Sequence, residues 1–303
     1  MQYTPIFAGL EAGGTKMVCG LGRWEAHTGS WQILERITVP TRAPAETMEA
    51  ISAFFMEQTY GDIQALGIAA FGPLDLSPNS PTYGSITTTP KLAWRHYPIK
   101  NVLEAQLGVP VAIDTDVAGA ALGEARFGAG KGAQHLVYMT VGTGIGVGII
   151  LNGAIARGLT HPEFGHINVR KAPSDDFPGV CPYHGDCLEG LASGSAIEKR
   201  AGQAGDTLPP DHPVWEDVAY ALGEAVVTLL LTVGPEKVVL GGGVMKQASL
   251  FPRIRRHVID ALNGYLMHPL LPEHVQALIV PPGLGDLSGL YGALELARMH
   301  RDG

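Results

Sequence analysis

Short apolar runs alternate with glycine-rich turns and with stretches of helical periodicity along the chain. Apolar runs bounded by turn residues predict buried strands, whereas apolar residues three or four positions apart predict helices. In the first half, strands are expected at 6–11, 16–21, 31–39, 65–70 and 109–113. Helices are expected at 44–58 and 98–107, where a proline suits the first turn, and from Asp116 to about Phe127.

The same order of elements begins again in the second half. A strand at 135–141, the turn Gly142-Thr143-Gly144 and a strand at 145–151 repeat the strand, glycine turn and strand found around Gly13. The later elements are helices at 195–200 and 211–233, a strand at 237–240 that runs into Gly241-Gly242-Gly243, and a last amphipathic helix at about 287–303. This coarse duplication predicts two α/β domains. We expect an N-terminal domain at 1–116, on which the last helix packs, and a C-terminal domain at 117–286.

Size and charge limit the classes of partner. The 303 residues are 46% hydrophobic, which is enough for two modest cores, and the net charge is −8. Nucleic acids and anionic membranes require basic surfaces, so neither is expected as a partner. The apolar runs are too short to span a bilayer, and no basic segment followed by an apolar one opens the chain. A cytoplasmic location is therefore expected.

A group of cysteine and histidine residues is the clearest chemical pattern. Two of the three cysteines, Cys181 and Cys187, flank His184, and His166 lies upstream. Two thiolates and two imidazoles form the ligand set of a closed, structural zinc site, because four protein ligands leave no position for a catalytic water. One alternative is a loop without metal. The other is a disulfide between the two cysteines, which the odd cysteine count and a reducing compartment disfavour. We predict structural Zn²⁺ in a loop of the C-terminal domain.

Glycine-rich turns are candidate phosphate sites. The run Gly128–Gly132 lacks the spacing of a P-loop, and a strand rather than a helix follows the glycines at 142–148, unlike in a dinucleotide-binding motif. Two hairpin turns remain, Gly13-Gly14-Thr15 and Gly142-Thr143-Gly144, whose backbone N–H groups are open to an anion. Each turn alone fits an ordinary β-hairpin equally well. The pair, together with the glycines after the strand at 237–240, favours phosphate binding.

Asp116 is the best candidate for a general base. It follows the strand at 109–113 within Asp114-Thr115-Asp116, and ligands of open α/β sheets bind at the carboxyl ends of strands. A carboxylate there can accept the proton of a sugar hydroxyl as the oxygen attacks a γ-phosphate. The competing interpretations are that Asp116 caps the next helix and that Asp114 is the base.

Seven motifs, in order over essentially the whole chain, resemble those of the ROK family of sugar kinases. They are Glu11–Lys16, Phe71-Gly72-Pro73, Thr115-Asp116, Gly142–Gly146, Glu163–His166, Cys181–Gly190 and Gly241–Val244. The stretches Thr89–Pro98 and Cys181–Cys187 resemble the bacterial fructokinase/mannokinase branch in particular. The resemblance implies a two-domain actin/hexokinase-like (ribonuclease H-like) fold with an active-site cleft between the domains. It also implies phosphate transfer from ATP with Mg²⁺ to a hexose, most of all to O6 of D-fructose, and a homodimer.

Carried over to the matching positions, the resemblance implies a role for each motif. Asp116 is the base, and the sugar ligands are Thr115, Glu163, His166 and Glu189. The zinc ligands are His166, Cys181, His184 and Cys187. The residues implied to bind ATP are Gly13, Gly14, Thr15, Lys16, Gly142, Thr143, Gly144, Gly194, Gly241, Gly242 and Gly243.

Three departures from the family pattern bear on these roles. Glu11 replaces the first Asp of the D-x-G-G-T motif, although its longer side chain can still reach Mg²⁺ or a water bound to it. Thr115 replaces the Asn that contacts the sugar in glucokinases of the family, which argues against strict glucose specificity. His184 replaces a central cysteine and keeps the number of metal ligands at four.

The alternatives within the family are a mannokinase, a glucokinase or an N-acyl-hexosamine kinase, and a sugar sensor without catalysis. Repressors of the family need a DNA-binding module. This chain has neither the extra N-terminal length nor the basic charge for one, so an enzyme is expected.

Overall fold

The computed structural model describes residues 5–266 and 274–302. Contacts divide the chain into two compact units. Unit 1 comprises the described residues of Met1–Gly128, Ile155–His161 and Leu287–Gly303, and unit 2 those of Ala129–Ala154 and Pro162–Asp286. The contacts therefore group the segment after Asp116 with unit 1, whereas the sequence analysis placed the domain boundary at 116. The C-terminal helix belongs to unit 1 as well.

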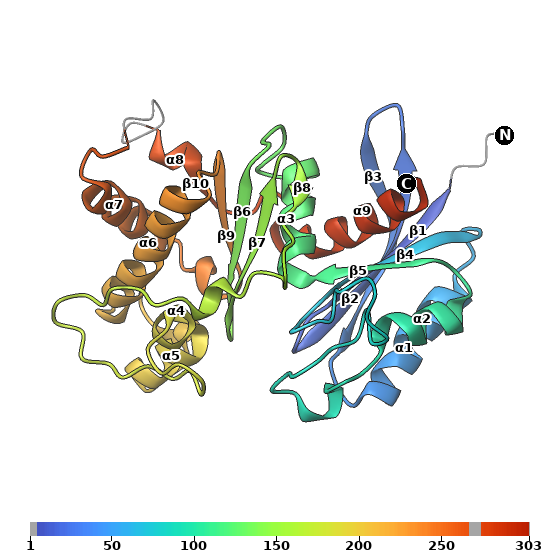
Figure 1. Cartoon of the computed structure of the whole chain (residues 1–303), viewed down its shortest axis with the longest axis horizontal. Helices are drawn as coiled ribbons and strands as arrows, with labels where there is room; N and C mark the ends of the chain where they lie inside the picture. The colour runs from blue at the N-terminus through green and yellow to red at the C-terminus, as the bar shows by residue number, and fades with distance from the viewer. Residues whose placement is uncertain (1–4, 267–273, 303) are drawn as a thin grey trace. The chain divides into compact units, whose positions relative to one another are not determined.

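Unit 1 is built on a mixed five-stranded sheet (Figure 1). Its strands are β1 (Ile6–Ala12), β2 (Lys16–Glu25), β3 (Ser30–Pro40), β4 (Ile63–Ala70) and β5 (Val111–Thr115), in the order β3-β2-β1-β4-β5. β1, β2 and β3 pair in antiparallel fashion, whereas β4 runs parallel to β1 and β5 runs parallel to β4. The carboxyl ends of β1, β4 and β5 therefore lie at the same edge of the sheet.

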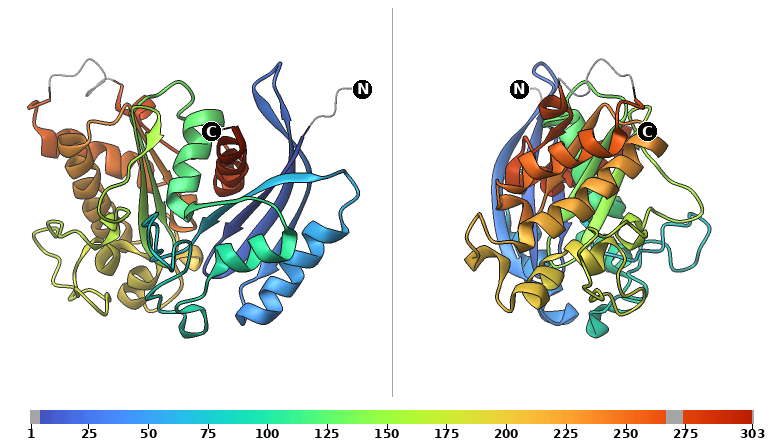
Figure 2. Two further views of the ribbon diagram at one scale, coloured as in Figure 1. Left: turned by 45° about the vertical axis from the view of Figure 1, so that its right-hand side comes forward. Right: turned by 90° about the vertical axis from the view of Figure 1, so that its left-hand side faces the viewer.

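Helices cover both faces of this sheet. They are α1 (Pro44–Glu57), α2 (Ile99–Leu107), α3 (Asp116–Phe127) and α9 (Ser288–Asp302). Alternate residues of β1 point to opposite faces. Ile6 and Leu10 join a buried cluster with α1 and α2, whereas Phe7 joins a second cluster with Leu290 and Leu294 of α9. Figure 2 shows α9 on the face of the sheet opposite to α1 and α2.

Glycines allow α9 to pack closely against its neighbours. A Cβ atom at Gly67 of β4 would lie 1.8 Å from the carbonyl oxygen of Ala293. One at Gly292 would lie 1.7 Å from the carbonyl oxygen of Gly119 in α3. The backbones approach so closely at these two points that no side chain fits between them.

Unit 2 contains a second five-stranded sheet, in the order β10-β9-β6-β7-β8. Its strands are β6 (Leu136–Val141), β7 (Ile145–Leu151), β8 (Ala154–Ile155), β9 (Lys237–Gly241) and β10 (Ile279–Val280). β6 pairs with β7 in antiparallel fashion and with β9 in parallel. The turn after β6 and the glycines after β9 therefore lie at the same edge.

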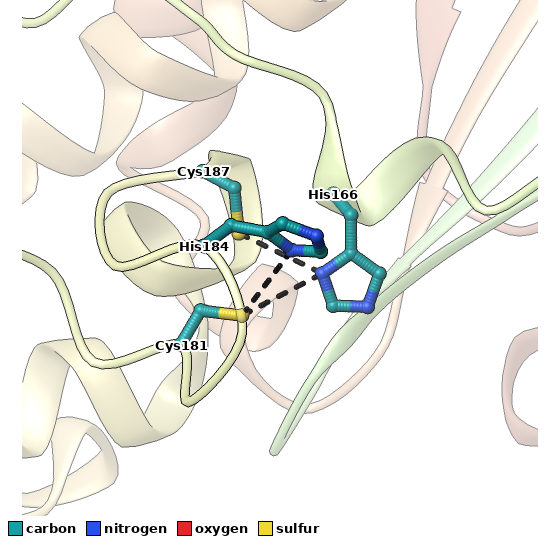
Figure 3. Close-up of side chains that lie close together, drawn as sticks. All are labelled: His166, Cys181, His184 and Cys187. Carbon is teal, nitrogen blue, oxygen red and sulfur yellow. Dashed lines mark hydrogen bonds between the residues drawn. The ribbon is translucent and has the colours of Figure 1, made fainter. Parts of the chain in front are cut away.

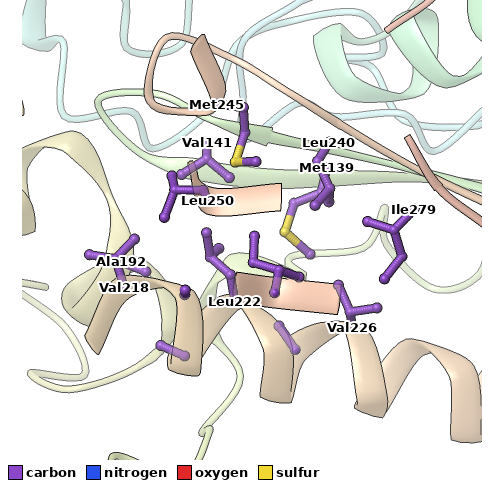
Figure 4. Close-up of a cluster of buried hydrophobic side chains, with 14 of the residues drawn as sticks. Met139, Val141, Ala192, Val218, Leu222, Val226, Leu240, Met245, Leu250 and Ile279 are labelled. Carbon is purple, nitrogen blue, oxygen red and sulfur yellow. The ribbon is translucent and has the colours of Figure 1, made fainter. Parts of the chain in front are cut away.

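The core of unit 2 lies between this sheet and its helices (Figure 4). The helices are α4 (Leu188–Ala192), α5 (Gly194–Ala201), α6 (Val214–Thr232), α7 (Leu250–Leu262) and α8 (Val275–Leu278). Met139 and Leu240 of the strands pack with Leu222 and Val226 of α6 in one buried cluster. Among the described residues, no helix is both long enough and apolar enough to cross a membrane.

The α/β fold class is confirmed, and most predicted elements agree with the structure to within a few residues. β5 begins at Val111 rather than at 109, because Pro110 has no N–H to donate to the sheet. β2 continues to Glu25, beyond the expected end at 21, because it forms a long hairpin with β3. The short helix α4 was not predicted, because its five residues lie in a loop too short for helical periodicity to be visible.

Candidate active site

Strand register places three candidate segments of unit 1 side by side. Ala12 of β1 pairs with Ala70 of β4, and Ala70 pairs with Thr115 of β5. The next residues along each strand are Gly13, Phe71 and Asp116. The glycine turn, the Phe71-Gly72-Pro73 motif and the candidate base therefore leave the sheet at the same level of its edge.

Asp116 stands at the first turn of α3 but does not cap it. Thr115 is the N-cap residue, and its hydroxyl accepts a hydrogen bond from the Ala118 N–H at 3.2 Å. The Asp116 carboxylate accepts one from the Val117 N–H at 2.9 Å and is half-buried. Thr115, which is 5% exposed, therefore caps the helix in place of Asp116. The sugar contact expected of Thr115 stays a prediction.

Asp114, the competing candidate for the base, is buried and makes its contacts within the protein. It is 1% exposed and accepts a hydrogen bond from the Thr115 N–H at 2.8 Å. The Arg157 guanidinium forms an ion pair with its carboxylate. Both carboxylate oxygens of Asp114 thus already accept hydrogen bonds within unit 1, one from the Thr115 N–H and one from Arg157. This geometry favours Asp116 over Asp114 as the base.

The glycine turn of unit 1 is a closed hairpin tip. The Gly13 N–H donates to the Lys16 carbonyl oxygen at 3.0 Å. Thr41, just after β3, holds the turn from the side, since its hydroxyl donates to the Gly13 carbonyl at 2.7 Å and its N–H to the Thr15 carbonyl at 2.9 Å. Thr15 and Lys16 are exposed. The four predicted ATP ligands at 13–16 are therefore adjacent and accessible.

Glu11 points toward the first turn of α9. A Cβ atom at Gly289 would lie 2.4 Å from Glu11 Cδ. The longer side chain that replaces the family's aspartate is thus accommodated by a glycine on the neighbouring helix. The contact keeps the carboxylate near the carboxyl end of β1, where the sequence analysis expected a magnesium ligand.

The glycine turn of unit 2 joins Val141 to Ile145 and is one residue shorter than the unit 1 turn, which joins Ala12 to Met17. Its support differs as well. The Gly142 N–H donates to the Gly144 carbonyl at 2.9 Å. The N-terminus of α5 packs on this turn, since the Gly194 N–H donates to the Gly142 carbonyl at 2.7 Å and the Ser195 hydroxyl to the Thr143 carbonyl at 3.1 Å. The predicted residue Gly194 is thereby brought to the turn, and the Ser195 contact was missed by the sequence analysis.

The glycines after β9 join the same edge of unit 2. Gly241 pairs with Thr140 of β6, two residues before Gly142. Gly242 has a φ of 90°, and a Cβ atom there would lie 2.4 Å from the Val141 carbonyl oxygen. Only glycine adopts this conformation beside so close a backbone. The structure thus brings Gly142–Gly144, Gly194 and Gly241–Gly243 together.

Glu189 lies against the unit 2 turn. Its Oε2 accepts a hydrogen bond from the Ile145 N–H at 2.9 Å, and a Cβ atom at Gly144 would lie 2.5 Å from the same oxygen. Gly165 packs on the Ile145 carbonyl oxygen, which a Cβ atom there would approach to 2.0 Å. The Glu163 side chain is exposed, and the Glu163 carbonyl accepts a hydrogen bond from the His166 N–H at 3.0 Å. Glu189 and the segment Glu163–His166 therefore lie beside the start of β7.

The predicted zinc ligands form one cluster in unit 2 (Figure 3). Candidate ligand atoms of His166, Cys181, His184 and Cys187 all lie within 4.8 Å of one another. Nδ1 of His166 lies 3.7 Å from Sγ of Cys181 and 3.6 Å from Sγ of Cys187, and Nδ1 of His184 lies 3.7 Å from Sγ of Cys181. Tetrahedral zinc with ordinary bond lengths separates sulfur and nitrogen ligands by about 3.6 Å. The donor set and its spacing fit zinc.

The thiols of this cluster are sheltered from solvent. Cys181 and Cys187 are 7% and 0% exposed, and all three cysteines are free thiols. Burial is the main cause that raises the pKa of Cys187 to about 11, so a bound cation would be needed to hold it as a thiolate. Cys19, whose role the sequence left open, lies in the core of unit 1, where burial raises the pKa of its thiol to about 12.

A buried ion pair anchors the loop between His166 and Cys181. Arg200 of α5 donates two hydrogen bonds to Asp175, at 2.9 and 2.7 Å, and one to the Leu191 carbonyl at 3.1 Å. Its guanidinium lies 4.1 Å from the centroid of the Phe177 ring. The hydrogen bonds from Arg200 are the largest cause that holds the pKa of the Asp175 carboxyl below its usual range. The sequence analysis missed this pair, because its residues are 25 positions apart.

Comparisons with known proteins identify the family of this chain. A model of the ROK family matches residues 7–300. The fructokinase of Pediococcus pentosaceus is 44% identical over 293 residues, which cover 97% of this chain and 98% of that protein. The fructokinase of Zymomonas mobilis is 41% identical over 298 residues, 96% of each chain. A solved ROK family glucokinase from Streptomyces griseus, in complex with glucose and AMPPNP, matches with a TM-score of 0.74 at 28% identity and covers 97% of this chain and 99% of its own.

Proposed function

Because the chain belongs to the ROK family, we propose that it is an ATP-dependent hexose kinase that converts D-fructose to D-fructose 6-phosphate. Asp116 is the general base. The observation that carries this assignment is the register of Ala12, Ala70 and Thr115, which puts Asp116 and the Gly13 turn at one edge of the unit 1 sheet. An ATP:hexose 6-phosphotransferase needs a base and a phosphate-binding turn as neighbours.

Asp116 acts on the attacking hydroxyl. Its carboxylate orients the O6 hydroxyl and accepts the proton as the oxygen attacks the γ-phosphorus of ATP. The hydrogen bond from the Val117 N–H fixes one carboxylate oxygen. Asp114 does not take this role in our proposal, because its carboxylate is paired with Arg157.

The glycine turns bind the phosphates and the nucleotide. Backbone N–H groups of 13–16 and 142–144 donate to phosphate oxygens, since no Cβ atom shields the glycines. Gly194 and Gly241–Gly243 contact the nucleotide beside the second turn. Mg²⁺ accompanies ATP and neutralises phosphate charge when it is bound, and Glu11 is the carboxylate of unit 1 that would hold it or its water.

The residues around the start of β7 bind sugar hydroxyls. Glu163, His166 and Glu189 supply two carboxylates and an imidazole, which suit a polyhydroxylated substrate. Structural zinc on His166, Cys181, His184 and Cys187 would fix the orientation of the His166 ring, because Nδ1 faces the thiols and Nε2 stays available for a hydroxyl. Thr115 is the remaining sugar contact that we propose.

Fructose is the preferred hexose in this proposal. The relatives named fructokinase in Pediococcus and Zymomonas support it, and so does the replacement of the glucokinase Asn by Thr115. The alternatives are mannose, glucose and N-acyl-hexosamines. We further propose a cytoplasmic homodimer, which light scattering of the purified protein checks: a mass of one chain contradicts the dimer.

An assay of ADP release tests the function directly. Fructose, mannose, glucose and N-acetylated hexosamines are offered with Mg·ATP, and fructose is expected to give the highest kcat/KM. Asp116→Asn is expected to keep sugar binding and to lower kcat by about 100- to 10,000-fold. Near-normal kcat in that variant sinks the assignment of the base, and wild-type protein that phosphorylates none of the sugars favours a sensor.

A further inference from the structure

The side chain of Lys91 lies over the glycine turn of unit 1. A Cβ atom at Gly14 would lie 3.1 Å from Lys91 Cε. The two residues are 77 positions apart, so the contact is made by the fold and not by local sequence. Lys91 lies within the stretch Thr89–Pro98, to which the proposed function assigns no role. The contact with Gly14 places the cationic side chain of Lys91 beside the tip of the glycine turn.

The backbone of Lys91 is held on both sides. The Lys91 N–H donates to the hydroxyl of Thr89, a residue 1% exposed, at 3.3 Å. The Lys91 carbonyl accepts the Trp94 N–H at 2.9 Å and begins a single 3-10 turn, Leu92–Trp94. Trp94 is 2% exposed and packs against Phe71 with ring centroids 5.9 Å apart. The backbone of Lys91 is therefore fixed by hydrogen bonds on both sides.

Residues 41–42 connect the turn that contains Lys91 to the glycine turn of unit 1. The Trp94 indole N–H donates to the Arg42 carbonyl at 2.8 Å. The preceding residue, Thr41, donates its hydroxyl to the Gly13 carbonyl at 2.7 Å. Residues 41–42 thus hold the glycine turn and the Lys91 turn at once. The position of Lys91 over Gly14 follows from this shared anchor.

The charge of Lys91 is not neutralised locally. Within residues 5–266 and 274–302, neither Lys91 nor Lys16 forms an ion pair or a side-chain hydrogen bond. Lys91 is half-buried, and its ammonium group can donate three hydrogen bonds. Two unneutralised lysines beside an open glycine turn are arranged for an anion, because a point charge and backbone donors act together on phosphate.

We propose that Lys91 contacts a phosphate group of ATP at the Gly13–Lys16 turn and is a nucleotide-binding residue of the kinase. This inference rests on the proposed function and assigns a role to a residue outside the seven motifs. A methyl group at Gly14 would shift the Lys91 side chain by a few tenths of an ångström, because it would lie 3.1 Å from Lys91 Cε.

Lys91→Ala is the test, with Lys131→Ala as the matched control. Lys131 is an exposed lysine of the glycine-rich run in unit 2, and its replacement removes the same charge. We expect Lys91→Ala to lower kcat/KM for ATP by about 10- to 100-fold, the usual effect of losing a hydrogen bond to a charged group, with little change in the KM for fructose. Lys91→Arg is expected to restore most of the activity. Equal kcat/KM values for Lys91→Ala and Lys131→Ala overturn the proposal.

Binding separates this inference from the proposed function. Calorimetry with AMPPNP is expected to show weaker binding to Lys91→Ala than to the wild type, whereas adenosine, which has no phosphate, binds both equally. This comparison stands even if the wild type phosphorylates no sugar. Weaker adenosine binding to a variant of unchanged melting temperature contradicts a phosphate contact. In a double-mutant cycle, Gly14→Ala should weaken AMPPNP binding in the wild type and have a smaller effect beside Lys91→Ala.

Discussion

Both glycine turns close a β-hairpin, but side chains of opposite charge border them. In unit 1 the Gly13 N–H closes the turn on the Lys16 carbonyl, and in unit 2 the Gly142 N–H closes it on the Gly144 carbonyl. Lys16 and Lys91 border the first turn. The carboxylate of Glu189 borders the second, within hydrogen-bond distance of the Ile145 N–H. The glycine pattern therefore predicts a turn, and residues distant in sequence determine which charges surround it.

The supports of the two turns differ as well. Thr41 holds the first turn through two hydrogen bonds. The second turn is held by the N-terminus of α5 and by Glu189, which lies two residues after the metal-ligand candidate Cys187. We therefore expect the unit 2 turn, and only that turn, to depend on the Cys/His cluster.

The largest expected effect comes from breaking the metal cluster. Cys187→Ser is expected to abolish zinc binding and to destabilise unit 2 by about 4–5 kcal/mol, at the upper end for a single substitution, because metal binding and loop folding are linked. Metal analysis and thermal unfolding measure the two effects. The KM for fructose should rise, while binding of AMPPNP should change less.

Cys19→Ala is the matched control, since it removes a buried cysteine from unit 1 and should leave one zinc per chain. Full stability of Cys187→Ser, or a zinc content well below one per chain in the wild type, would show that the cluster is not a structural metal site.

The fold was largely predictable from the sequence because its elements are long and strongly patterned. Strands β1 and β7 and the C-terminal helix α9 stand out through apolar runs or helical periodicity. The sequence could not predict which residues far apart along the chain pack against each other. The close packing of α9 on Gly67 joins residues more than two hundred positions apart and leaves no local sign in the sequence.

The second effect concerns the ion pair that anchors the metal-binding loop. Asp175→Asn removes the nearer carboxylate partner of the buried Arg200 guanidinium and leaves Asp217, at 3.6 Å, as the remaining one. We therefore expect a loss of about 2 kcal/mol in the free energy of unfolding at pH 7, the usual effect of losing hydrogen bonds to a charged group. Urea titration measures it. A loss of the same size in the Asp186→Asn control, at a half-exposed carboxylate paired with Lys171, would contradict a special role for the buried pair.

The same pair predicts a pH dependence. The pKa of Asp175 is lowered in the folded protein, so the unfolded state binds the proton more tightly. The contribution of Asp175 is fully present above the unfolded value of about 3.9 and is lost as the pH falls through the lower, folded pKa. The stability of the wild type should therefore fall in acid more steeply than that of Asp175→Asn. Parallel curves for the two proteins argue against this linkage.

A third pair of variants tests the opposite charges at the two turns. Glu189→Gln is expected to raise the KM for fructose by about 10- to 100-fold with little effect on ATP, because it weakens a charged hydrogen bond to the sugar. Lys91→Ala is expected to lower kcat/KM for ATP with little effect on the KM for fructose. Steady-state kinetics with each substrate varied in turn should give a crossed pattern. If both variants affect the same substrate, the charge difference does not separate sugar from nucleotide.

The candidate site was predictable only where a motif is contiguous. The Asp116, Gly142-Thr143-Gly144 and Cys181–Cys187 segments each contain their own chemical signal. Lys91 and the Arg157–Asp114 pair have no such signal, because a single lysine or arginine is common on any surface. The tertiary contacts that give them a role, with Gly14 and with a buried carboxylate, appear only in the structure.

The smallest expected effect is at Gly144. A methyl group there would lie 2.5 Å from the Glu189 carboxylate, but it would meet the far end of a flexible side chain that can move aside. Gly144→Ala should therefore raise the KM for fructose only about threefold, or ~0.7 kcal/mol, and should have no further effect in a Glu189→Ala background. A double-mutant cycle measures the coupling. If Gly144→Ala instead weakens AMPPNP binding and does so independently of Glu189, the unit 2 turn serves the nucleotide alone and its carboxylate is only a structural support.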